Sequence, residues 1–233
     1  MTTNKITRRA LLTAGIAGTA GAVAIPGLAL WKRGLKVTAM NKGSLPEIAA
    51  PSKPGASAHL IPNVKVKTHD GRTCMFYDDL IRDRIVTINF MSVRGDSVYP
   101  VVDNLVKVQR LLGNRVGRDI FMYSVTTDPA HDTPDVLKDF AAKKGLGPGW
   151  TFVTGGKREV DFLRNFLFIR RLFGPTRAPS QGHHGACCSV GLVRYGNERL
   201  CRWASFPAKV TPEFIATRFQ WLGFRRGDAP TYG

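Results

Sequence analysis

Cysteine and acidic residues are scarce in this sequence. Its 233 residues include four cysteines, too few for a fold held together by disulfides. Asp and Glu number 17 against 34 Lys and Arg, which gives a formal net charge of +17. A hydrophobic fraction of 43% excludes a disordered chain, and the length suits one domain with tails. The excess positive charge leaves three partners open: nucleic acid, an acidic protein or an anionic membrane surface.

Charge is also absent from a long run near the amino terminus. Lys5, Arg8 and Arg9 precede an uncharged stretch from Ala10 to Trp31. A basic segment followed by an apolar one is typical of an export signal, and the run Thr7-Arg8-Arg9-Ala10-Leu11-Leu12 resembles the twin-arginine signal. We therefore expect a protein of the bacterial periplasm. Because an exported protein rarely meets nucleic acid and no nucleic-acid-binding motif is present, an acidic protein or an anionic membrane surface is the expected partner.

The fate of this amino-terminal segment stays open. Ala22-Val23-Ala24 has the small-x-small form of a cleavage site. If the segment is not cleaved, Ala10 to Trp31 is long enough to cross about 30 Å of hydrocarbon as a helix and would tether the protein to the inner membrane. Residues 1–31 are thus a twin-arginine-type signal or a transmembrane anchor.

The remaining chain divides into a linker at 32–59, rich in Pro, Gly, Ala, Ser and Lys, a domain at 60–224 and a tail at 225–233. Apolar periodicity in the domain predicts a hairpin at 64–77, buried strands at 85–91, 120–125 and 150–154, helices at 100–112, 132–144, 159–173 and 211–222, and a hairpin at 187–205. This order predicts one α/β domain, with a mixed central sheet and helices on both faces, in the order of a thioredoxin-like fold with an N-terminal hairpin.

Two segments carry a family resemblance. Asp128-Pro129-Ala130-His131-Asp132-Thr133-Pro134-Asp135-Val136-Leu137 and Pro148-Gly149-Trp150-Thr151-Phe152-Val153-Thr154-Gly155 resemble those of the copper metallochaperones called SCO or SenC proteins. The likeness extends over residues 61–222 and includes the Asp70-Gly71 turn. It implies a thioredoxin fold and a copper site made by a Cys-x-x-x-Cys-Pro motif and a distant His.

The sequence departs from this family at the motif itself. Counting back from Pro100, the two cysteine positions fall on Tyr99 and Gly95, neither of which supplies a thiolate for copper or disulfide exchange. The distant His of the family corresponds best to His184, which lies close to His183, Cys187 and Cys188. Two interpretations stay open: a relocated copper site at these four residues, or a relic of the family site with structural cysteines.

These observations predict a non-enzymatic SCO-like accessory subunit or assembly factor of a membrane respiratory oxidoreductase complex containing copper or haem. Its expected partners are that complex, an acidic periplasmic protein such as a c-type cytochrome, and the anionic membrane surface. No cofactor is expected. The alternative is a copper metallochaperone for cytochrome oxidase assembly that uses the relocated site. A thiol peroxidase or reductase is disfavoured because Gly95 to Tyr99 contains no nucleophilic thiol.

Several single residues carry further expectations. Asp132 is expected to cap the helix that follows it, and His69 and His131 to be exposed. If Tyr195 faces Glu198 across a Gly196-Asn197 turn, Cys201 lies opposite Leu192 and is too far from Cys188 for a disulfide. A disulfide from Cys74 to another cysteine stays open.

Overall fold

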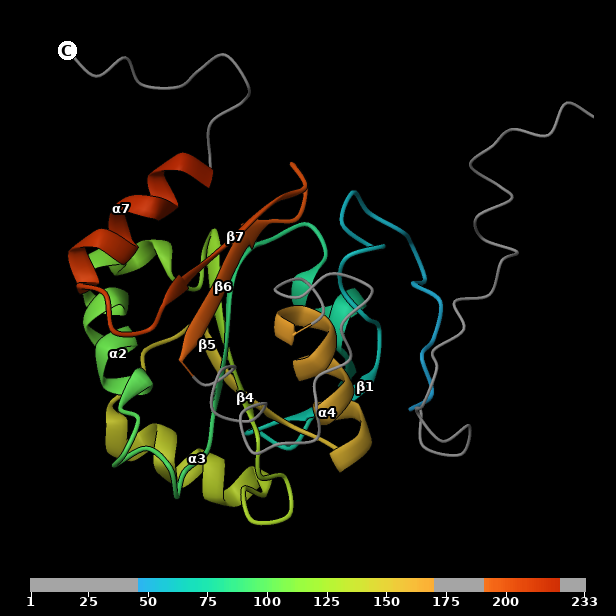
Figure 1. The fold of residues 1–233 in the computed structure, drawn as a ribbon, viewed down its shortest axis with the longest axis horizontal. Coiled ribbons are helices and arrows are strands. Elements are labelled where there is room, and N and C mark those ends of the chain that lie inside the picture. The colour runs from blue at the N-terminus through green and yellow to red at the C-terminus, as the bar shows by residue number, and fades with distance from the viewer. Residues whose placement is uncertain (1–45, 170–190, 223–233) are drawn as a thin grey trace, which may run out of the picture. The chain divides into compact units, whose positions relative to one another are not determined.

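A seven-stranded mixed sheet forms the centre of the structure, a computed structural model that describes residues 46–169 and 191–222 (Figure 1). These residues all belong to the second of the chain's two units, Asn41–Gly233. The strands are β1 (Lys65–Thr68), β2 (Thr73–Met75), β3 (Ile85–Met91), β4 (Ile120–Thr126), β5 (Trp150–Thr154), β6 (Leu192–Asn197) and β7 (Arg202–Pro207). The helices are α2 (Val101–Leu112), α3 (Pro134–Lys144), α4 (Lys157–Arg164) and α7 (Pro212–Leu222), with short helical segments η1 (Phe76–Ile81), η2 (Gly113–Arg115) and η3 (Asn165–Ile169).

The strand order is β2-β1-β5-β4-β3-β6-β7. The three central strands β5, β4 and β3 run parallel, whereas β1 and β6 pair antiparallel to them on either side. A parallel pair needs a crossover connection, and α2 and α3 supply the two crossovers here. This arrangement confirms the predicted α/β fold with a mixed sheet and an N-terminal hairpin.

Helices cover both faces of the sheet, and each face has its own apolar core. Figure 1 shows α2, α3 and α7 on one side of the sheet and α4 on the other. Because side chains alternate along a strand, Val86, Ile88 and Phe90 of β3 pack with η1, α4 and η3. On the opposite face, Met122 and Phe152 pack with α2, α3 and α7. No helix within residues 46–169 and 191–222 is long and apolar enough to cross a membrane.

The predicted register of the carboxyl-terminal hairpin is wrong. Tyr195 pairs with Ala204 and Asn197 with Arg202, so the turn consists of residues 198–201 and Cys201 lies in it with a φ of +50°. The cause is Glu198, whose fully buried carboxylate accepts hydrogen bonds from Tyr77 Oη at 2.7 Å and Ser57 N at 2.9 Å. Burial of this side chain, rather than the turn preference of Gly-Asn, therefore sets where the chain reverses.

The residues just before the predicted domain boundary lie against the domain. Three backbone amides of this segment donate hydrogen bonds to the domain. The amide of Ala49 donates to Asn63 O, that of Ser52 to the Asp78 carboxylate, and that of Gly55 to Tyr77 Oη. The part of the predicted linker that the structure describes, residues 46–59, is thus hydrogen-bonded to the sheet hairpin and η1. Residues 1–31, the remainder of the linker and the tail at 225–233 lie outside the described residues.

Candidate functional site

The loop between β3 and α2, residues 92–100, contains Gly95 and Tyr99, the two positions predicted to correspond to the cysteines of the SCO motif. It follows the carboxyl end of a central parallel strand, the edge of α/β sheets where ligands usually bind. The amide of Tyr99 donates a hydrogen bond to the carbonyl oxygen of Gly95 at 3.0 Å. This spacing is that of one helical turn, so positions 95 and 99 face the same side of the loop.

Gly95 is closely surrounded although it has no side chain. Its amide donates to Ser92 Oγ at 3.1 Å, and a Cβ atom added at Gly95 would lie 2.7 Å from that oxygen. A side chain here requires Ser92 to rotate. Tyr99 and its neighbour Val98 are 38% and 69% exposed, so the loop presents apolar surface to solvent in place of a dithiol.

Three contacts fix this loop to its neighbours. Lys144 at the end of α3 lies 2.6 Å from Asp96 Oδ2, Arg94 lies 3.1 Å from Asp128 Oδ2, and the amide of Val93 donates to Asp132 Oδ2 at 3.1 Å. Burial alone would lower the pKa of Lys144, but hydrogen bonds to the carboxylates of Asp103 and Asp96 outweigh it and raise the pKa. The ammonium group therefore stays charged and bridges the loop, α2 and α3.

Asp132 does not cap α3, contrary to the prediction. Thr133 is the N-cap and accepts a hydrogen bond from the amide of Val136, while Asp132 is completely buried one residue earlier. Its carboxylate accepts a hydrogen bond from Thr126 Oγ1 at 2.6 Å as well as that from Val93. The role of Asp132 is thus to join the end of β4 to the loop after β3.

His131 is partly exposed, whereas His69 is half-buried, contrary to the prediction that it is exposed. His131 Nδ1 lies 2.8 Å from Asp132 Oδ1, and its side chain is 38% exposed. A His-Asp pair also occurs in nucleophilic enzymes, but no hydroxyl or thiol of the described residues hydrogen-bonds the other ring nitrogen of His131. His69 Nδ1 accepts from the amide of Phe152 at 3.1 Å and so extends the pairing of β1 with β5.

Copper does not fit the donor set at this loop. Glycine and tyrosine are poor ligands for a soft metal, and the part of the chain that the structure describes holds no group of three His, Cys, Asp or Glu able to bind a metal. Cys74 is a buried free thiol and Cys201 an exposed one. His183, His184, Cys187 and Cys188, the predicted relocated site, lie outside the described residues.

The comparisons with known proteins concern the sequence and the fold. A family model described as SCO1/SenC matches residues 75–182. No curated protein sequence matches the chain significantly. Among solved structures, yeast Sco1 with copper bound is 14% identical, with 77% of this chain and 100% of that chain covered and a TM-score of 0.54. A SCO1/SenC family lipoprotein from Bacillus anthracis is 15% identical, with 70% and 95% covered and a TM-score of 0.54.

BsSco, described as a member of the Sco family of cytochrome c oxidase assembly proteins, is 16% identical, with 76% of this chain and 96% of that chain covered and a TM-score of 0.52. Identities this low show a shared fold alone, and the family match rests on the sequence model over residues 75–182. Residues 75–182 of this chain therefore match the SCO1/SenC family model, and its mixed sheet shares the thioredoxin-like fold of the Sco structures.

Proposed function

We propose that this protein is a non-enzymatic accessory subunit or assembly factor of a membrane respiratory oxidoreductase complex, and that it acts by docking. One observation carries the proposal: the loop at 92–100 is held in place by Lys144, Asp128 and Asp132, although Gly95 and Tyr99 stand at its predicted cysteine positions. Ordering a loop costs conformational entropy, so its fixed shape favours a role in recognition. The protein would work on the periplasmic side of the membrane, tethered by residues 1–31.

The surface around this loop suits an acidic partner. Arg94 is 65% exposed and belongs to the same loop as the exposed side chains of Val98 and Tyr99, a composition typical of interface anchors. A groove of about 500 Å³ between α2 and α3 begins where Lys144 contacts the loop, and it contains four cations and one acid. These groove residues are Asp103, Val106, Lys107, Arg110, Phe140, Lys143 and Lys144. Such a cationic surface attracts an acidic protein and accelerates its association.

Co-purification in mild detergent tests the proposal. We expect the full-length chain to copurify with a membrane oxidoreductase complex, and Val98→Asp to weaken this association because it places a charge at the apolar centre of the loop. Leu200→Asp, an equivalent change at an exposed apolar residue of the β6–β7 turn, is the matched control and should leave it intact. A monomer without a copurifying complex, or equal behaviour of the two variants, contradicts docking through this loop.

Copper titration separates this proposal from its alternative. The accessory role predicts no tight copper binding that depends on His184. If the full-length chain binds copper tightly and His184→Ala abolishes that binding, the chain is a metallochaperone with a relocated site and the accessory proposal fails.

A further inference from the structure

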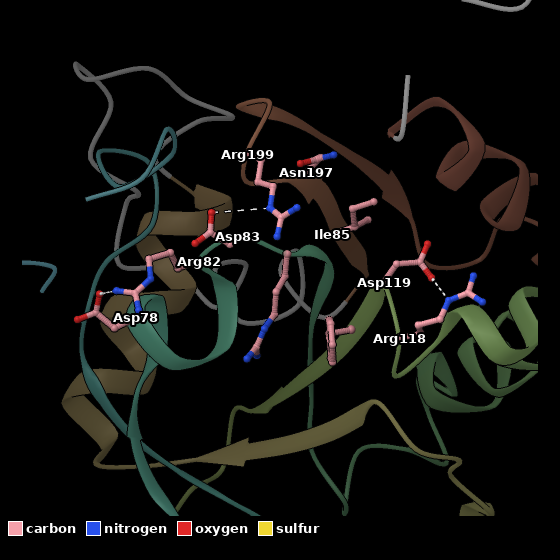
Figure 2. Close-up of a pocket in the computed structure, with 10 residues that line it drawn as sticks. Asp78, Arg82, Asp83, Ile85, Arg118, Asp119, Asn197 and Arg199 are labelled. Carbon is pink, nitrogen blue, oxygen red and sulfur yellow. Dashed lines mark hydrogen bonds and ion pairs between the residues drawn. The ribbon is translucent and has the colours of Figure 1, made fainter. Parts of the chain in front are cut away.

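A second pocket lies at the opposite end of β3 from the loop at 92–100 (Figure 2). Its volume is about 520 Å³, within the range of small-molecule sites. The lining residues are Asp78, Arg82, Asp83, Arg84, Ile85, Arg118, Asp119, Phe121, Asn197 and Arg199. Ile85 is the first residue of β3, and the strand is seven residues long, so the pocket lies roughly 20 Å from the loop. The two sites are therefore separate.

Arg84 carries a positive charge that only neutral groups contact. Its guanidinium carbon lies 4.7 Å from the centre of the Phe121 ring, and Nη1 donates to Tyr123 Oη at 2.9 Å and to Leu80 O at 3.2 Å. Burial raises the pKa of Tyr123 above its ordinary value, so the phenol cannot supply a negative charge at neutral pH. No carboxylate of the described residues pairs with Arg84. A half-buried cation held in this way is preorganised for an anion.

Two further arginines of the pocket lining, Arg118 and Arg199, form only long ion pairs with neighbouring aspartates. Arg118 Nε lies 3.5 Å from Asp119 Oδ1, and the other oxygen of Asp119 is already held by Arg115 at 3.1 Å. Arg199 Nε lies 3.7 Å from Asp83 Oδ1. Figure 2 shows these two pairs on different sides of the pocket. Their arginine side chains are 68% and 69% exposed, and pairs of this kind contribute little stability, so a ligand can compete for both guanidinium groups.

We propose that this pocket binds a phosphate group, either free phosphate or a small phosphate ester. The three guanidinium groups come from three separate segments: the turn before β3, the turn before β4 and the β6–β7 turn. The lining holds four arginines and three aspartates, and Figure 2 shows Arg118 and Arg199 on different sides of the pocket, so these two contribute mainly to its positive potential. Arg84 is the arginine that can bind the ligand directly, since a guanidinium group holds two phosphate oxygens at once. Phosphate carries up to two negative charges against one for a carboxylate, so the net positive charge of the lining favours phosphate. The volume exceeds that of phosphate alone, and the apolar side chains of Ile85 and Phe121 can contact the organic part of an ester.

Calorimetric titration of the full-length chain in detergent with inorganic phosphate and with glycerol 3-phosphate, at constant ionic strength, tests this inference. We expect saturable binding and about a tenfold loss of affinity in Arg84→Met, which retains a long side chain over Phe121 but removes the charge. Arg158→Met on the exposed surface of α4 changes the net charge equally and is the matched control, with less than about a twofold effect.

A second variant guards against misfolding of Arg84→Met. Arg118→Met combined with Arg199→Met alters only well-exposed side chains and should fold normally, with an affinity lowered about fivefold or more. Tighter binding of glycerol 3-phosphate than of phosphate identifies an ester site, such as one for a lipid headgroup, and the reverse order identifies a free-phosphate site. Absence of saturable binding to both probes, or equal losses in Arg158→Met and the pocket variants, overturns the inference.

Discussion

The ammonium group of Lys144 lies 2.6 Å from a carboxylate oxygen of Asp96, so the last turn of α3 holds the loop that follows β3. The same nitrogen lies 2.6 Å from Asp103 of α2. The loop, α2 and the distant end of α3 thus share one cation, and the shape of the loop at positions 95 and 99 depends on it.

Lys144→Met should loosen this loop without unfolding the domain. We expect faster hydrogen exchange of the amides of Val98 and Tyr99. The free energy of unfolding should fall by about 1 kcal/mol, because the ion pairs of Lys144 with Asp96 and Asp103 are lost. Lys143→Met, at the exposed neighbouring position, is the control. Unchanged exchange in Lys144→Met would mean that local backbone hydrogen bonds alone hold the loop.

Introducing two cysteines should recreate a dithiol. Positions 95 and 99 are one helical turn apart, with Cβ atoms about 5–6 Å from each other, so a small backbone adjustment allows a disulfide in Gly95→Cys/Tyr99→Cys. Rotation of Ser92 away from the new Cβ should cost about 1 kcal/mol, the value of its hydrogen bond to residue 95. Peptide mass spectrometry after oxidation detects the bond, and each single variant serves as control. Two thiols that remain free under oxidising conditions would contradict the observed loop geometry.

Removal of the Asp132 carboxylate should be strongly destabilising. Asp132→Ala leaves Thr126 Oγ1 and the Val93 amide without their acceptor, at a cost of about 3 kcal/mol. Asp135→Ala, which changes an exposed acid in the first turn of α3, should cost less than about 1 kcal/mol. Urea denaturation measures both, and similar midpoints would show that the buried network adds nothing to stability.

The two described cysteines should differ in reactivity. Burial raises the pKa of Cys74 to about 11, so its thiolate is rare at pH 8, whereas Cys201 is exposed in the β6–β7 turn. Iodoacetamide should alkylate Cys201 in the native protein and Cys74 only after denaturation, as read by peptide mass spectrometry. The raised pKa favours the folded state below pH 9, and this contribution is lost as the pH rises from 9 towards 11. Early alkylation of Cys74 would contradict its burial.

Strands and helices with a clear apolar period were predictable from the sequence. Ile85 to Met91 reads as a strand buried on both faces and is β3, and Pro134 with the two lysines before Gly145 marks the ends of α3. The position of the loop at 92–100 follows from that strand and from the helix after Pro100. These features depend on neighbours in sequence, which is why the local pattern is sufficient for them.

Features that depend on distant polar partners were not predictable. Asp132 resembles a helix cap, but the side chains that bury it come from the ends of β3 and β4. Glu198 resembles an exposed turn residue, yet Ser57 and Tyr77 enclose it from more than a hundred residues away. The pocket around Arg84 was missed for the same reason, because Arg84, Arg118 and Arg199 come from three different turns. The one local signal was that Arg84 directly precedes the buried strand β3, which places a charged side chain at the end of the sheet.

The position of β6 between β3 and β7 also determines when the sheet can be completed during synthesis. β3 gains its second neighbour only from residues 193–197, more than a hundred residues later in the chain. Until that hairpin has left the ribosome, the central strand has one unpaired edge of backbone amides and carbonyls. The sheet is therefore completed only when the carboxyl-terminal hairpin pairs with β3. A nascent chain that stops before β6 leaves one edge of β3 without a hydrogen-bonding partner.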